Sequence, residues 1–86
     1  MIRPAMEGTV HLINPDFGLV ALDTRTRFTV IEQTGSDFEI GDYVSWTSDR
    51  QIGLGEVRNV SRARTIRAYF QLHGVPAAFL KVNLHL

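Results

Sequence analysis

The first sixty residues alternate between short runs of apolar side chains and clusters of turn-forming ones. In residues 6–13, Gly8, Val10 and Leu12 fall on one side of an extended chain, and the residues between them fall on the other. This period of two predicts a strand. Similar runs predict strands over residues 17–22, 27–32, 43–48 and 55–61. They are separated by turn signals, of which Asn14, Pro15 and Asp16 form the first.

Five short, evenly spaced strands are typical of a small OB-type β-barrel. Closure is expected because an open five-stranded sheet would leave two edges free to pair with other chains. The connection between the third and fourth strands, residues 33–42, is too short for a long helix. The sequence therefore predicts an all-β domain over residues 1–61, of the compact kind.

The pattern changes after Ser61. Ile66, Tyr69, Phe70 and His73 are spaced at i, i+3, i+4 and i+7, which predicts an amphipathic helix. Gly74 would end that helix, and Pro76 would begin a second short one over residues 77–84. Residues 62–86 are thus expected to be a C-terminal α extension of one or two short helices. Such short helices need a surface to pack on, either the barrel or a partner.

Length and composition narrow the class of protein. A chain of 86 residues forms one domain, and the absence of cysteine excludes disulfides and thiolate metal sites. The N-terminus has no signal-peptide pattern, and no apolar stretch is long enough to span a bilayer. We therefore expect a soluble, cytoplasmic protein without a membrane span.

Candidate chemistry is sparse. His11, His73 and His85 are scattered without metal-ligand spacing, and the carboxylates show no pairing suited to acid–base catalysis. Residues 68–84 superficially resemble a helix-turn-helix, but the second helix would be too apolar to read base edges. We therefore expect a non-catalytic protein that uses no metal or cofactor.

The net charge of zero conceals an asymmetry. Residues 1–60 contain five basic and nine acidic side chains, a balance of 5 − 9 = −4, whereas residues 61–86 contain four basic and no acidic ones, or +4. A tail of opposite charge to its domain can dock on that domain or reach a polyanion. Both uses stay open at this point, with docking the simpler one.

Several motifs in residues 6–61 are similar to those of the bacterial cold-shock domain. Residues 6–11 match the opening strand of that family, residues 14–20 match a shortened first ribonucleoprotein motif, and residues 27–31 match the second motif. Residues 40–46 match the fourth strand and residues 55–60 match the last. The chain resembles this family over about two-thirds of its length. The resemblance implies an OB barrel that binds single-stranded RNA or DNA.

The resemblance also implies a mechanism of binding. In that family bases stack on aromatic rings on one face of the barrel, at roughly 1–3 kcal/mol per base, while basic groups hold the phosphates. Here Phe17 and Phe28 match platform positions, His11 replaces a lysine, and Leu12, Leu19, Val30 and Ile31 stand where further rings would be. The candidate nucleic-acid-binding residues are therefore Phe17, Phe28, His11, Arg27, Arg58, Arg62 and Arg64.

Aliphatic side chains at positions where that family has aromatic rings suggest a second interpretation. Phe17, Leu19, Phe28 and Val30 would form an apolar patch, and a small monomer rarely leaves such a patch bare. We expect either the predicted C-terminal helix to cover it, through Ile66, Tyr69 and Phe70, or a homodimer to form through it. In this alternative the protein is a protein–protein interaction or assembly module. Trp46 shares a strand face with Val44 and is predicted to lie in the core, with Tyr43 on the surface.

Overall fold

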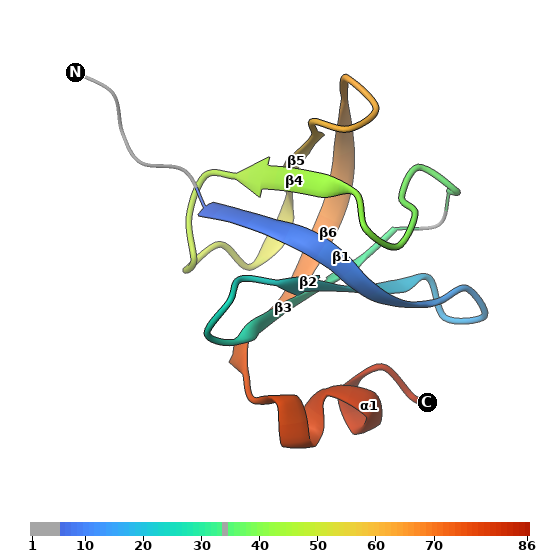
Figure 1. The fold of residues 1–86 in the computed structure, drawn as a ribbon, viewed down its shortest axis with the longest axis vertical. Coiled ribbons are helices and arrows are strands. Elements are labelled where there is room, and N and C mark those ends of the chain that lie inside the picture. Colours follow the sequence, from blue (N-terminus) through green and yellow to red (C-terminus); the bar gives the residue numbers. More distant parts are fainter. Residues whose placement is uncertain (1–5, 34) are drawn as a thin grey trace.

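A computed structural model describes residues 6–33 and 35–86. It contains six strands: β1 (Met6–Asn14), β2 (Leu19–Asp23), β3 (Phe28–Glu32), β4 (Tyr43–Trp46), β5 (Gly53–Asn59) and β6 (Arg64–Val75). A 3₁₀ turn, η1 (Ala77–Phe79), and a one-turn helix, α1 (Leu80–Asn83), follow. The predicted all-β barrel with a short helical C-terminal extension is confirmed (Figure 1).

The strands form a closed barrel in the order β1-β2-β3-β6-β5-β4, in which β4 pairs with β1 and every neighbouring pair is antiparallel. Strands β4, β1, β2 and β3 follow one another around the wall, which is the spatial order of a Greek key. Because six strands make the ring, β2 and β5 stand on opposite walls. This placement decides which side chains can share a surface.

The strand count differs from the predicted five, because residues 64–75 form β6 and not a helix. Ile66 and Phe70 are four residues apart. That spacing places two side chains on the same face of a helix, and it places them on the same face of a strand as well, because four is a multiple of the strand period of two. In the barrel both point inward with Ala68, whereas Tyr69 points outward, so the helix predicted over residues 66–73 is wrong. Residue 61, the predicted end of the barrel, lies in the β5–β6 turn, and the barrel wall continues to Val75.

Strand β6 closes the barrel because it pairs along both of its edges. Seven residue pairs join it to β5, from Gly53 opposite Phe70 to Asn59 opposite Arg64. Its other edge pairs with β3, with register shifts around Val30. The irregular pairing places His73 beside the barrel interior: its ring stacks on Phe70 and bonds Thr29 Oγ1 at 3.0 Å.

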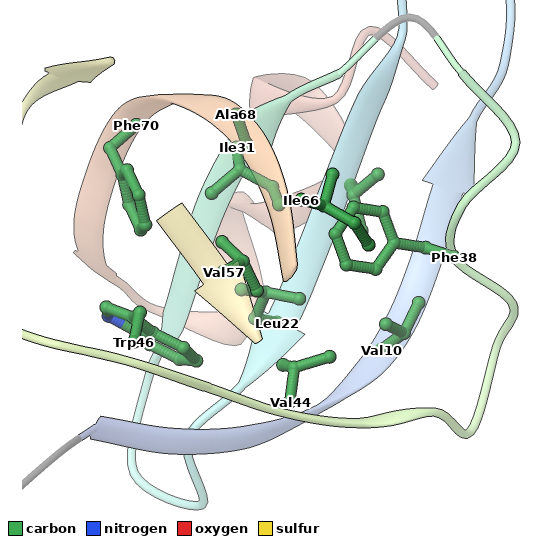
Figure 2. Close-up of a cluster of buried hydrophobic side chains, with 11 residues drawn as sticks. Val10, Leu22, Ile31, Phe38, Val44, Trp46, Val57, Ile66, Ala68 and Phe70 are labelled. Atoms are coloured by element: carbon green, nitrogen blue, oxygen red, sulfur yellow. The ribbon is translucent and has the colours of Figure 1, made fainter. Parts of the chain in front are cut away.

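The barrel interior is filled by one apolar cluster. Figure 2 shows side chains from all six strands pointing toward one another, with Phe38 and Trp46 at opposite ends of the cluster in this view. Trp46 is buried, as predicted, and Tyr43 is exposed, as predicted. Phe38 comes from the β3–β4 connection and extends the cluster beyond the strands. The cluster consists of Val10, Val20, Leu22, Ile31, Phe38, Val44, Trp46, Val57, Ile66, Ala68 and Phe70.

Neighbouring substitutions in β6 test this assignment. Phe70→Ala removes a fully buried ring and is expected to lower the free energy of unfolding by about 3–5 kcal/mol. Tyr69→Ala removes an outward side chain and is expected to cost less than about 1 kcal/mol. Denaturant unfolding followed by the fluorescence of Trp46, the one tryptophan, measures both. Equal losses for the two variants would contradict the inward–outward alternation of β6.

Candidate functional site

The outer face of the β2–β3 hairpin carries the apolar patch predicted from the sequence. Leu19, Ala21 and Val30 alternate with the inward residues of the same strands, so their side chains lie on the outside of the barrel. They are nevertheless buried, and they form a second apolar cluster separate from the barrel interior. Something other than the barrel wall must therefore cover them.

The cover is the segment that follows β6. Val75, Leu80 and Leu84 pack against the hairpin, and Leu84 has no exposed surface. Pro76 has an extended backbone (φ −67°, ψ 153°) and lets the chain leave β6 before η1 begins. The C-terminal cover proposed from the sequence is thus present, but Ile66, Tyr69 and Phe70 do not provide it, because they belong to β6. The residues from Val75 to Leu86 are called the cap below.

Asn14, at the end of β1, fastens the cap. It is 5% exposed, and its side-chain Nδ2 donates a hydrogen bond to the Leu84 carbonyl oxygen at 2.7 Å. Its Oδ1 accepts one from the backbone N–H of Asp16 at 3.2 Å, which shapes the β1–β2 turn. The sequence indicated a turn at Asn14, but a bond between residues 70 apart leaves no local signal.

The two predicted stacking rings lie at opposite ends of the capped face. Phe17 is in the β1–β2 turn, near the end where Leu19 pairs with Glu32, and Phe28 pairs with Asp23 at the other end. The exposed Phe17 ring stacks on His85 of the cap, with centroids 4.6 Å apart and planes 8° apart. Phe28, which is half-buried, contacts His11 at 5.2 Å between centroids. The surface between the rings is aliphatic and covered, so the rings form no continuous platform.

The predicted phosphate-binding arginines do not gather around these rings. Arg27 is exposed beside Phe28 and is the one member of the set close to the capped face. Arg58 is on β5, opposite β2, and its Nη1 bonds Thr65 Oγ1 at 3.4 Å. Arg62 and Arg64 lie at the β5–β6 turn, also away from Phe17 and Phe28. The candidate set is therefore divided between two sides of the molecule.

Arg62 and Arg64 are engaged by carboxylates of the β3–β4 connection. Arg62 forms ion pairs with Glu39 at 2.5 Å and with Asp42 at 3.2 Å. Arg64 pairs with Asp37 at 2.8 Å. Part of the positive charge of residues 61–86 thus docks on the acidic part of the same chain, which is the first of the two uses considered for it.

Asn59 and the half-buried Asp42 form the base of this polar cluster. Asn59 is fully buried, and its Nδ2 donates to the Asp37 carbonyl oxygen and to Asp42 Oδ2, both at 2.9 Å. Burial raises the pKa of Asp42, but hydrogen bonds from Asn59, the Glu39 backbone and Arg62 outweigh it and hold the pKa below its ordinary value. Asp42 is therefore ionised at neutral pH and fixes the β5–β6 turn to the β3–β4 connection.

Comparison with protein-family models, with curated proteins and with solved structures finds no match. Within residues 6–33 and 35–86 no group of three or more His, Asp or Glu side chains is placed to hold a metal ion. The same residues contain no helix long and apolar enough to cross a membrane. Inference about function therefore rests on the contacts of the capped face and of the arginines.

The polar cluster gives a pH-dependent prediction. Asp42→Asn removes the carboxylate from three hydrogen-bond donors and is expected to cost about 1–3 kcal/mol of stability at pH 7. The pKa of Asp42 is lower in the folded protein than in the unfolded chain, where it is about 3.9. The stability that the carboxylate contributes is therefore fully present above the unfolded-state pKa, and it is lost as the pH falls through the folded-state pKa. Unfolding free energies of wild type and variant, measured from neutral to acid pH, should converge in acid. Parallel curves would contradict this role, and Asp49→Asn, an exposed aspartate, is the control.

The attachment of the cap gives a second prediction. Leu84→Ala empties a fully buried position and is expected to weaken cap docking by about 2 kcal/mol. Amide exchange should then accelerate in residues 79–86 and change little in the strands, because the cap opens locally. Val82→Ala, at a position 71% exposed, should leave exchange unchanged. Equal effects of both substitutions would mean that Leu84 does not anchor the cap.

Proposed function

We propose that this chain is a non-catalytic protein-interaction or assembly module built on a small closed barrel. The observation that carries the proposal is the cap: the face on which the cold-shock resemblance places base stacking is occupied by the chain's own Leu80 and Leu84. A ligand on that face would have to displace both side chains and the hydrogen bond from Asn14.

The charge distribution supports the same proposal. Nucleic-acid binding draws much of its affinity from free cationic groups that meet phosphates. Arg62 and Arg64 are already paired with carboxylates of this chain, and the net charge is zero. Phosphate binding by these arginines would exchange existing ion pairs for new ones and would gain correspondingly little.

Exposed apolar side chains favour a protein partner. Leu54 on β5 is 65% exposed and Tyr69 on β6 is 44% exposed, and the cap turns Phe79, Val82 and Leu86 outward. Large apolar and aromatic side chains exposed on so small a protein are typical of interaction surfaces. The capped face itself is satisfied within the chain, so we expect a partner to bind elsewhere.

Binding of single-stranded RNA or DNA is the second candidate, and one local feature favours it. His11, Arg27 and Phe28 lie together at one end of the β2–β3 hairpin, with Arg27 exposed. Together with Phe17, two rings would supply about 2–6 kcal/mol at the usual value per base. Membership of the cold-shock family and a cytoplasmic location stay predictions, because a barrel fold alone serves many functions.

An amide chemical-shift titration with oligo-dT and oligo-U separates the two candidates. We expect no saturable shifts at low salt, either in wild type or in the Leu80→Ser, Leu84→Ser double variant that releases the cap. Saturable shifts at His11, Arg27 and Phe28 that weaken as salt rises would overturn the proposal in favour of nucleic-acid binding. Shifts that appear only in the double variant would also overturn it, and would assign the cap an inhibitory role.

A further inference from the structure

Strands β5 and β6 run side by side in the barrel wall (Figure 1). Their outer surface combines apolar and charged groups in a regular arrangement. Leu54 lies directly opposite Tyr69, and Glu56 lies directly opposite Arg67. All four side chains are exposed. We call these four residues the β5–β6 face. It is a two-by-two patch in which an apolar row adjoins a row carrying one negative and one positive charge.

Neither Glu56 nor Arg67 forms an ion pair with another residue in the part of the chain that the structure describes, residues 6–33 and 35–86. Among the described residues, the ion pairs are those of Arg62 with Glu39 and Asp42, and of Arg64 with Asp37. Glu56 and Arg67 are therefore free to pair with groups on another molecule, although they are cross-strand neighbours. The Glu56–Arg67 row is complementary to a copy of itself turned by 180°. Arg58, the next outward residue of β5, lies beside that row opposite Thr65, whose Oγ1 accepts a hydrogen bond from its Nη1.

The β5–β6 face also adjoins a hollow, which suits such packing. A hollow of about 240 Å³ lies beside the apolar row, lined by Glu32, Gln33, Leu54, Arg67, Ala68 and Tyr69. An isologous interface places the same patch of both copies in contact, so a protruding side chain of one copy can enter the hollow of the other. Two sheets that pack face to face bury their outward side chains in this manner.

We infer that the β5–β6 face is a self-association surface, and that its occupant is a second copy of this chain. Leu54 and Tyr69 of the two copies form the apolar centre, and Glu56 of each copy pairs with Arg67 of the other. The net charge of zero adds no long-range repulsion between copies. This inference deepens the proposed function, on which it rests, by naming the partner and the surface.

The cap offers a competing surface, but its chemistry is less suited to self-association. Phe79, Val82 and Leu86 are exposed there, and the charged side chain among them is Lys81. Two copies meeting through the cap would bring their lysines together, and no side chain of the cap is acidic. The cap follows the end of β6 and lies at the opposite end of the long axis from the β5–β6 turn (Figure 1), and none of its residues belongs to the β5–β6 face. Variants can therefore address the two surfaces separately.

Sedimentation velocity over a range of concentrations, from about 10 μM to about 1 mM, tests the inference in the full chain. The small face predicts weak dimers, in the range of transient interfaces. Leu54→Asp is expected to weaken dimerisation at least about tenfold, because it places a carboxylate in the apolar centre. Val82→Asp makes the same kind of change on the cap and is expected to leave dimerisation unchanged.

Charge-reversal variants test the pairing of Glu56 with Arg67 between the two copies more specifically. Arg67→Glu leaves two acidic groups on the face and Glu56→Arg leaves two basic groups, so each variant alone should dimerise at least about tenfold more weakly than wild type. An equimolar mixture of the two should restore association, because the acidic face of one meets the basic face of the other. Arg25→Glu makes the same charge change at the β2–β3 turn and should have no effect. Circular dichroism of each variant confirms that the fold is retained.

The outcomes separate this inference from the proposed function. A wild-type chain that stays monomeric at the highest concentration, or a dimer abolished by Val82→Asp and insensitive to Leu54→Asp, overturns the inference. Either result leaves a protein-interaction module intact, with a different partner or surface. A mixture of the charge variants that fails to associate, while the wild type dimerises, also overturns the Glu56–Arg67 pairing. Overturning the proposed function itself requires the oligonucleotide binding described above.

Discussion

The pairing of β6 with both β3 and β5 is the contact on which the rest of the structure depends. Strands β1, β2 and β3 form one meander, strands β4, β5 and β6 form another, and β1–β4 pairing joins them along one side. The β3–β6 ladder joins them along the other side and closes the wall. Closure pairs the edges of the sheet and creates the interior that holds Phe70 and Trp46. It also fixes where the cap begins, because Val75 ends β6 beside Phe28.

Closure explains why the predicted site is divided. In a ring of six strands β6 stands between β3 and β5, so the outer surfaces that carry Phe28 and Arg58 point in different directions. The cap then fills the first of these faces, and the β3–β4 carboxylates engage the arginines at the β5–β6 turn. What remains open is a surface on which apolar and charged side chains are mixed, as with Leu54, Tyr69, Glu56 and Arg67 on β5 and β6.

The sequence predicted those features that local chemistry determines. Turn residues and the period of two located the first five strands within a few residues, and Pro76 marked the start of the short helical segment. Residues 66–73 were misassigned because Ile66 and Phe70 satisfy both periods, and the choice between them is made by the unpaired edges of β3 and β5. The bond of Asn14 to Leu84 and the ion pairs of Arg62 were beyond prediction from sequence pattern, because each joins segments that meet after the barrel has closed.

The position of β6 in the chain has a consequence for biosynthesis. As the chain leaves the ribosome, β3 is complete well before residues 64–75 emerge, and β5 ends at Asn59, shortly before β6 begins at Arg64. Until β6 pairs with them, both strands present an unsatisfied backbone edge. Exposed edges of this kind recruit other strands, so a nascent chain is most vulnerable to aggregation during that interval. Its duration is set by how quickly β6 pairs with both edges once it has emerged. Substitutions that slow this last pairing step would therefore lower the yield of soluble protein even where the finished barrel is as stable as before.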